Sequence, residues 1–115
     1  MQPRFQSIID TIRRQVFKQS GSVDIPLREA IARRVQQHVE GKASEPPPEG
    51  LSPHMLQFID KLAANAYKVV DRDFDHLYAE GYNQDQIFEI SVVAATAAGL
   101  GRLDHSLNLL NTVET

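Results

Sequence analysis

The stretch GYNQDQIFEISVVAATAAGLGRLDHSLNLL, from Gly81 to Leu110, decides the fold class of this chain. Glycine is the usual residue just beyond a helix end, and Asn83 with Gln86 three positions later has the spacing of a capping box. The next three turns are apolar on every side and carry one charge, Glu89. Because a helix that is apolar all round is buried among others, the stretch predicts the central helix of an all-α bundle.

Small residues occupy the middle of this helix, at Ala94, Ala95, Ala97, Ala98 and Gly99. Small side chains let two helix axes approach closely, so we expect another backbone to cross near residues 94–99. Gly99 and Gly101 also weaken helical structure. We therefore expect a kink or a break at this point, followed by a separate helix over residues 102–112.

The rest of the chain has the same helical periodicity, with apolar residues three and four positions apart. Further helices are expected over residues 3–19, 26–40, 53–68 and 72–80. Residues with cap-forming side chains precede three of them, at Asp24, Ser52 and Asp71, and glycines follow two of them, at Gly41 and Gly81. The sequence thus predicts a compact all-α bundle of five to six helices.

We expect a single domain over residues 1–115, in which an N-terminal helical hairpin (1–40) is joined to the core helices (53–115) by a proline-rich linker (41–52). Three consecutive prolines in the linker favour an extended polyproline II conformation. The linker is either a ligand for a proline-reading domain or a stiff spacer. The spacer is favoured, because no PxxP motif flanked by basic residues is present.

Composition excludes several functions. The 115 residues include no cysteine, which removes disulfides, thiolate nucleophiles and iron–sulfur clusters. The longest uncharged run, residues 90–101, is too short to span a bilayer, and the N-terminus lacks the features of a signal peptide. We expect a cytoplasmic protein that does not bind membranes.

Charge is unevenly distributed, with an excess of Lys and Arg over Asp and Glu in residues 1–42 and the reverse in residues 43–115. A basic half is either a surface for nucleic acid or membrane, or a set of solvated helix faces that complement an acidic remainder. Solvated faces are favoured because the arginines form isolated pairs. We therefore expect no nucleic-acid partner.

Two patterns suggest metal sites, and both fail on inspection. The run from Asp71 to Asp75 begins like a calcium-binding loop, but His76 and Tyr82 stand where such a loop needs glycine and glutamate. No two of the four histidines have the three-to-five spacing of zinc ligands on one helix. We expect neither a metal nor a cofactor.

Glu89 is the most informative single residue for chemistry. A carboxylate in an apolar helix either faces a pocket, where burial raises its pKa as a general acid or base requires, or forms a structural pair. The candidate partners in a pair are Arg102, Arg72 or a neighbouring subunit. For a pocket, His76 and His105 are the candidate catalytic partners, and Tyr67, Asp73 and Arg102 are the candidate ligand-binding residues.

The segment from Leu62 to Leu110 resembles the alkylhydroperoxidase D-like proteins of the carboxymuconolactone decarboxylase family. The likeness extends over residues 51–110 and is weaker over residues 1–50. It rests on a glycine, an acidic residue, an Ile-Phe-Glu triplet, a small-residue helix and an Arg-Leu pair. The matching residues are Gly81, Asp85, Ile87, Phe88, Glu89, Ala94, Ala95, Gly99, Arg102 and Leu103.

The resemblance implies an all-helical fold that assembles into homo-oligomers. The peroxidase branch of the family uses a Cys-x-x-Cys pair and a histidine, which would fall near Ala66, Val69 and Asp73 of this chain. His54 stands near the position of the family's helper glutamate. Without cysteines the chain cannot run a disulfide-based peroxidase cycle.

Two functions follow as expectations. The first is a homo-oligomeric binding protein without thiol peroxidase activity, which takes a small molecule or a partner. The second is a cofactor-free lyase or isomerase that uses Glu89 and a histidine as acid and base. A nucleic-acid adaptor with a basic face is a third class, and the charge distribution disfavours it.

Overall fold

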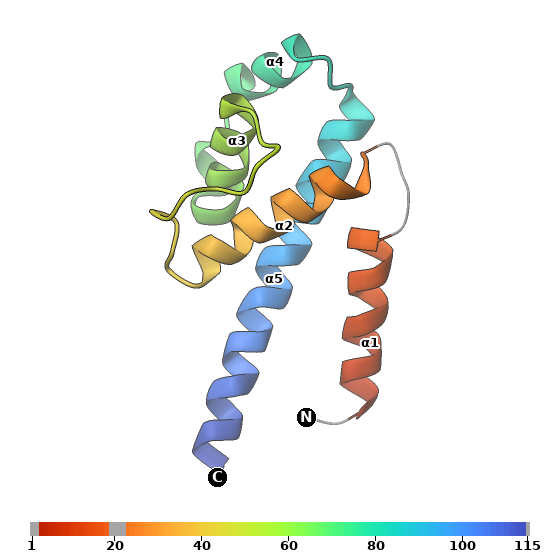
Figure 1. Cartoon of the computed structure of the whole chain (residues 1–115), viewed down its shortest axis with the longest axis vertical. Helices are drawn as coiled ribbons and strands as arrows, with labels where there is room; N and C mark the ends of the chain where they lie inside the picture. Colours follow the sequence, from red (N-terminus) through yellow and green to blue (C-terminus); the bar gives the residue numbers. More distant parts are fainter. Residues whose placement is uncertain (1–2, 19–22, 115) are drawn as a thin grey trace.

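The computed structural model describes residues 3–18 and 23–114, with side chains over residues 7–16 and 23–110. Its longest element is α5 (Gln84–Glu114), a helix of 31 residues that runs the length of the molecule (Figure 1). The all-α bundle is confirmed, and no described residue lies in a strand.

Four further α-helices and two short helical turns surround α5. On the N-terminal side these are α1 (Pro3–Arg13), the π-helical η1 (Arg14–Lys18) and α2 (Ile25–Val39). After the linker come α3 (Pro53–Ala64), the 3-10 turn η2 (Ala66–Lys68) and α4 (Asp71–Ala79). In Figure 1, α2 crosses α5, while α3 and α4 cover its N-terminal half.

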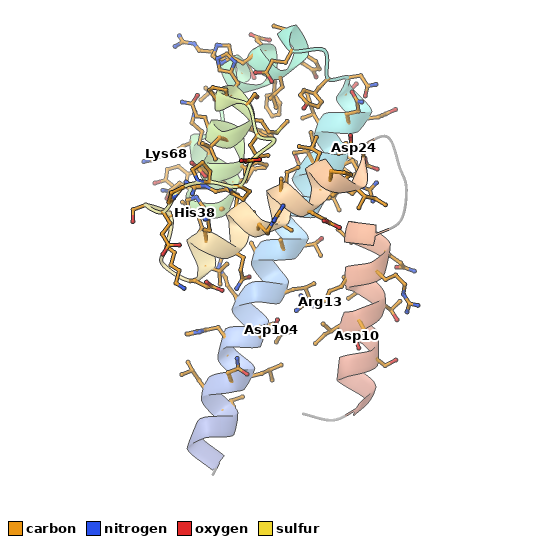
Figure 2. All side chains as sticks on the ribbon, in the orientation of Figure 1. Asp10, Arg13, Asp24, His38, Lys68 and Asp104 are labelled. Carbon is orange, nitrogen blue, oxygen red and sulfur yellow. The ribbon has the colours of Figure 1, made fainter. Side chains whose placement is uncertain are left out.

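The core lies where α2, α3, α4 and the N-terminal half of α5 meet. Its largest fully buried side chains come from all four helices: Ile31, Val35, Met55, Phe58, Ile59, Leu77, Ile90 and Val93. Beyond this crossing, α1 and the C-terminal half of α5 extend as two arms, with both chain ends on the same side of the molecule (Figure 1). Arg13 and Asp104 form an ion pair between the arms (Figure 2).

The predicted helix starts are confirmed in three cases. The Asp24 carboxylate accepts the Leu27 N–H at 2.9 Å, and the Ser52 hydroxyl oxygen accepts the Met55 N–H at 3.1 Å. At the start of α5, the backbone N–H and side chain of Asn83 exchange hydrogen bonds with Gln86, both at 2.8 Å. Short polar side chains therefore specified these boundaries, as the capping rules predict.

The sequence predicted Asp71 as an N-cap, and this prediction is wrong. Asp71 is the first residue of α4, and the N-cap is Val70. The side chain of Asp73 takes over the capping role, because its carboxylate reaches back to accept the Val70 N–H at 2.8 Å. The expected helix over residues 53–68 also ends early, at Ala64, where the Asn65 backbone leaves the helical region (φ −152°, ψ 75°).

The break expected near Gly99 does not occur, and α5 continues through residues 99–101. A glycine costs a helix only about 1 kcal/mol relative to alanine. The packing of Leu100 and Gly101, both buried, offsets this cost. The close approach of a second backbone near residues 94–99 stays a prediction, because the nearest atoms to Gly101 belong to the side chains of Gln36 and Val39 of α2, and none lies within 4 Å of a Cβ at Gly99.

The expectation that this helix is buried on every side is wrong. One face of α5 lies in the core, at Ile87, Ile90 and Val93, whereas Phe88 on the opposite face is 70% exposed. Apolar residues thus cover two faces of the helix, and among the described residues only the first of these faces is packed against other helices.

We predict that alanine has opposite effects at the two glycines of α5. A Cβ at Gly101 would lie 2.9 Å from Gln36 Oε1 and 3.3 Å from both methyl carbons of Val39, whereas a Cβ at Gly99 would meet nothing within 4 Å. Gly99→Ala should raise the free energy of unfolding by up to about 1 kcal/mol through helix propensity. Gly101→Ala should lower it, because overpacking costs about 1–3 kcal/mol.

Urea unfolding followed by circular dichroism measures both free energies. The two variants carry the same substitution two residues apart, so each is the control for the other. Equal stabilisation by both would contradict the close packing of α2 on Gly101.

Candidate functional site

A pocket of about 430 Å³ extends along α3, from Pro53 to Ala64, beside the C-terminal end of α2 and the η2 turn. Its apolar surface comes from Pro53, Leu56 and Ala64 of α3. Polar groups surround this surface, and they are His38, Gln57, Asp60, Lys61, Asn65 and Lys68. An apolar wall with a few polar groups at its edge is the usual form of a small-molecule site.

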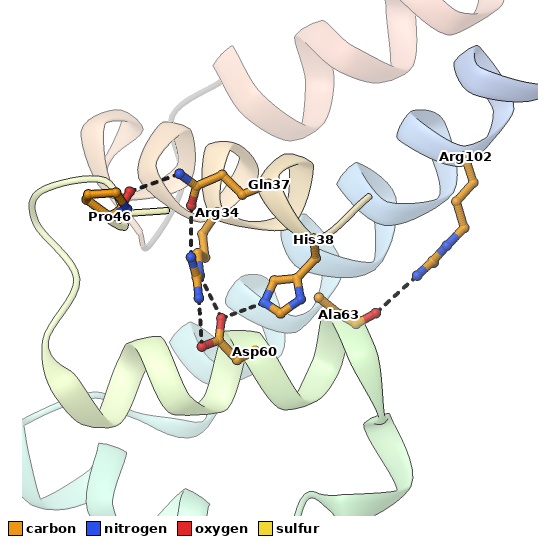
Figure 3. A network of polar contacts seen from close by, with 7 residues as sticks. All are labelled: Arg34, Gln37, His38, Pro46, Asp60, Ala63 and Arg102. Atoms are coloured by element: carbon orange, nitrogen blue, oxygen red, sulfur yellow. Dashed lines mark hydrogen bonds and ion pairs between the residues drawn. The ribbon is translucent and has the colours of Figure 1, made fainter. Parts of the chain in front are cut away.

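A chain of hydrogen bonds fixes His38 at the pocket wall (Figure 3). Its Nε2 lies 2.8 Å from Asp60 Oδ1. Arg34, which is buried, donates to both oxygens of the same carboxylate, at 2.8 Å from Nε and 3.1 Å from Nη2. Gln37 in turn accepts from Arg34 and donates to the Pro46 carbonyl of the linker. The bidentate arginine therefore holds the carboxylate, and the carboxylate orients the imidazole.

The spacing of α2 explains this arrangement. Arg34 and His38 are four residues apart and so lie on one face of the helix, over Asp60 of α3. Burial would raise the pKa of the Asp60 carboxyl, but hydrogen bonds and charge from Arg34 and His38 outweigh it and keep this pKa below its ordinary value. Asp60 is therefore ionised at neutral pH.

The two lysines of the pocket differ in their surroundings. Lys61 Nζ lies 2.9 Å from both oxygens of the buried Asp73 in α4. Lys68 is exposed and has no ion-pair partner among the described side chains, those of residues 7–16 and 23–110. His38 and Lys68 lie on the same side of the molecule (Figure 2). Lys68 is thus the cation at this site that is available to a ligand.

We predict that acid weakens the fold in the range below about pH 4. Burial opposes ionisation of Asp73, but the Val70 N–H and Lys61 outweigh it and keep its pKa below the ordinary value of 3.8, as Arg34 and His38 do for Asp60. A lowered pKa in the folded state stabilises the protein above the unfolded-state pKa, and this stabilisation is lost as the pH falls through the folded-state value. Urea unfolding between pH 7 and pH 2 measures the loss.

The lining residues decide what chemistry the pocket supports. His38 is oriented by a carboxylate, as a general base requires, and its Nδ1 has no hydrogen-bond partner in the part of the chain that the structure describes. The lining includes no serine, threonine or cysteine, so the pocket has no hydroxyl or thiol nucleophile. The arrangement suits binding of a small molecule, with proton transfer by His38 as its chemical option.

Glu89 lies in a structural ion pair away from this pocket. Its Oε1 accepts from Arg28 Nη2 at 2.7 Å, and its Oε2 accepts the Val23 N–H. Arg28 is 4% exposed and also donates to the Val16 carbonyl, at 3.1 Å. The prediction that Arg102 or Arg72 pairs with Glu89 is therefore wrong, since the arginine in the pair is Arg28 of α2. Through these contacts, the pair links Val23 and the start of α2 to α5.

The structure does not bring the candidate catalytic histidines to Glu89. His76 stacks on His54, with ring centroids 4.0 Å apart, at the junction of α3 and α4. His54 Nδ1 lies 3.2 Å from Glu80 Oε1. His105 is exposed on α5, sixteen residues beyond Glu89 and so about 24 Å along the helix axis.

The candidate ligand-binding residues are also apart. Tyr67 is 81% exposed and does not line the pocket. Asp73 is buried against Lys61 and caps α4. Arg102 donates to the Ala63 carbonyl at 3.0 Å, in the last turn of α3 (Figure 3). A cation at that end satisfies carbonyl groups that lack helical partners, so Arg102 has a structural role here.

The pocket residues were not among those that the sequence singled out. Asp60 and His38 are 22 positions apart, on either side of the linker, and no local spacing relates them. The available signals were the four-residue spacings of Arg34 with His38 on α2 and of Gln57 with Lys61 on α3. Spacings of this kind are common on solvated helices, so they did not distinguish a site.

The described side chains, those of residues 7–16 and 23–110, include no group of three or more acidic or histidine residues placed to hold a metal ion. None of the helices in these ranges combines the length and hydrophobicity that crossing a bilayer requires. Comparisons of the chain with models of protein families, with curated proteins and with solved structures gave no match.

Proposed function

We propose that this chain is a homo-oligomeric, cytoplasmic binding protein of the alkylhydroperoxidase D-like type that has no thiol peroxidase activity. Its ligand is a small organic anion with an apolar body, and the site is the pocket between α2, α3 and η2. The observation that carries the proposal is that Lys68, which has no ion-pair partner among the described side chains, and the oriented His38 both lie beside an apolar wall.

The position of the pocket supports the link to the resembled family. The family's two cysteines would fall near Ala66 and Val69, and the pocket residues Asn65 and Lys68 each stand next to one of these positions. The pocket thus occupies the region where the peroxidase branch carries its thiols. A site at the family's position but without thiols fits a protein that binds a small molecule there and has no thiol peroxidase activity.

Charge favours an anionic ligand. Asp60 is the one carboxylate in the pocket lining, and Arg34 and His38 both bind it. Lys61 is similarly paired with the Asp73 carboxylate. Lys68 is then left to bind an anion, and the side chains of Leu56 and Ala64 offer the apolar contact for its body. A medium-chain carboxylate such as hexanoate has this combination of groups.

Isothermal titration with hexanoate tests the proposal, with hexan-1-ol as the neutral analogue. We expect hexanoate to bind and the alcohol to bind at least tenfold more weakly, because a hydrogen bond to a charged group is worth about 1.5–3 kcal/mol. Lys68→Glu should abolish the preference for the acid. Lys42→Glu makes the same charge change outside the pocket and should leave it unaltered. Equal binding of acid and alcohol, or no binding of either, would contradict the proposal.

A cofactor-free lyase or isomerase is the second candidate, with His38 in place of Glu89 as the base. The ion pair of Glu89 with Arg28 counts against the original choice, and the hydrogen bond between His38 and Asp60 favours the new one. Incorporation of solvent deuterium into β-keto acids, followed by NMR, measures such proton abstraction. Incorporation that His38→Gln removes would support the enzyme.

A further inference from the structure

One face of α5 carries a continuous row of apolar and small residues that are exposed along almost the whole helix. Its members recur three or four positions apart and include no charged residue. The large members are Phe88, Val92, Leu103 and Leu110. The small members are Ala95, Gly99 and Ser106. We call these seven residues the α5 seam.

The seam lies opposite the face of α5 that enters the core. Residues of a helix are about 100° apart around the axis. The seam residues Val92 and Gly99 are therefore about half a turn away from the buried Ile90 and Gly101. A helix that is apolar on two opposite faces belongs inside a bundle, yet no described element of this chain covers the second face.

We infer that the α5 seam packs against the seam of a second copy of this chain, antiparallel, with the two-fold axis at Gly99. The inference extends the self-association in the proposed function and does not depend on the ligand pocket.

The order of side-chain sizes along the seam argues for a second copy. Phe88 and Leu110 are each eleven residues from Gly99, Val92 and Ser106 are each seven, and Ala95 and Leu103 are each four. An antiparallel pair centred on Gly99 therefore places every seam residue opposite another seam residue. Such a surface is complementary to itself, as a two-fold interface requires.

Two of these three pairs join a large member to a small one, and the outermost pair joins the two large residues Phe88 and Leu110. Leu103 faces Ala95 of the partner subunit, and Val92 faces Ser106 of the partner subunit. At the centre, a Cβ on Gly99 would meet no atom of its own chain within 4 Å, so the surface there is free to take a neighbouring helix. Large residues opposite small ones allow the two helices to interdigitate around a close central contact.

The size of the seam is consistent with a dimer. From Phe88 to Leu110 it extends about 33 Å at 1.5 Å per residue. Phe88 is 70% exposed and Leu110 is 55% exposed. Continuous exposed apolar surface on this scale marks interaction sites on soluble proteins.

The shape of the single chain agrees with a missing partner. Its radius of gyration is 15.1 Å, whereas a compact domain of about this length has a value near 13 Å. The excess comes from the two arms, α1 and the C-terminal half of α5 (Figure 1). The seam continues along the second arm through Leu103 to Leu110, so a partner there would cover surface that the chain itself leaves open.

Size-exclusion chromatography with light scattering tests the inference on the full chain. We expect wild type to have twice the chain mass of 12.9 kDa at high micromolar concentration. Val92→Glu and Leu103→Glu should each halve that mass with an unchanged helical circular dichroism spectrum. Tyr67→Glu, at an apolar residue that is 81% exposed on η2, should leave the dimer intact. A monomeric wild type, or a dimer that both seam variants retain, would overturn the inference.

Cysteine cross-linking tests the register, since the chain has no other thiol. Oxidation should link two copies of Gly99→Cys. A short thiol-to-thiol cross-linker should join Phe88→Cys chains to Leu110→Cys chains in a mixture, but should not join Phe88→Cys chains to each other. Efficient linking of Phe88→Cys to itself would indicate a parallel pair and overturn the antiparallel arrangement.

Ligand binding reports separately on the pocket. Val92→Glu should still bind hexanoate if the pocket proposal holds, because the pocket residues lie on α2, α3 and η2. The measured mass therefore tests the dimer inference alone, and the hexanoate titration tests the pocket proposal alone.

Discussion

Replacing Glu89 by glutamine is expected to lower the free energy of unfolding by about 3 kcal/mol, because the substitution removes the carboxylate charge from the ion pair with the buried Arg28. The Arg28 side chain is 4% exposed, so water cannot replace the carboxylate. Glutamine retains one oxygen for the Val23 N–H, and the loss therefore falls on the contact with the arginine. Urea unfolding at pH 7 measures the change.

Asp85→Asn is the matched control for this prediction. Asp85 is in the first turn of the same helix and is exposed, so neutralising it should cost only the few tenths of a kcal/mol that a surface charge near a helix start contributes. Equal stability of Glu89→Gln and Asp85→Asn would contradict a structural role for Glu89. The alternative hypothesis, that Glu89 is a catalytic residue, would then be favoured.

Replacing Asp73 by asparagine should be about as damaging, at about 2–4 kcal/mol. Asp73 is buried, accepts the Val70 N–H at the start of α4, and pairs with Lys61 of α3. Asparagine keeps one acceptor oxygen for the cap but loses the charge that compensates Lys61. Breaking a buried pair on one side leaves the remaining charge uncompensated. The variant should also lose part of the stability change between pH 5 and pH 2, because it removes one carboxyl with a lowered pKa.

The neighbouring Asp75 offers the control, because it is an exposed residue of the same acidic run. Asp75→Asn should change the stability by less than about 0.5 kcal/mol, as surface substitutions usually do. Equal losses in the two variants would mean that the whole run acts through the helix dipole and not through the contact of Asp73 with Lys61.

Local chemistry explains what the sequence predicted correctly. Asp24, Ser52 and the Asn83–Gln86 box each act over three residues, and Gly41 and Gly81 adopt left-handed backbone angles (φ +73° and φ +102°) just beyond their helices. Such signals depend on neighbouring residues only, so they can be identified without knowledge of the fold. The helical periodicity likewise depends on residues within a few turns.

The predictions that failed depend on contacts between distant residues. Gly99 and Gly101 suggested a break in α5, but the packing of Gln36 and Val39 against Gly101 maintains the helix. Glu89 was recognised as unusual, yet its partner Arg28 lies 61 positions away. In the same way, His38 meets Asp60 only because α2 and α3 pack face to face. Local spacing contains no information about such pairs.

The apolar character of α5 predicted burial on every side, whereas in the structure only one of its two apolar faces is buried. The face with Ile90 and Val93 enters the core of the chain, and the opposite face with Phe88 and Leu103 remains exposed. A single sequence cannot distinguish a helix buried within its own chain from one buried between two copies. The proposed contact between two α5 seams would cover four of the exposed apolar residues that the core does not use, namely Phe88, Val92, Leu103 and Leu110.

The most direct test of the proposed function is a titration of the isotopically labelled wild-type chain with hexanoate, followed by two-dimensional NMR. The account predicts that the amide signals of His38, Gln57, Lys61, Asn65 and Lys68 shift with hexanoate, and that hexan-1-ol needs at least a tenfold higher concentration to shift them. Shifts centred on Glu89 or His105, or none with either compound, would contradict the assignment of the site to the pocket between α2, α3 and η2.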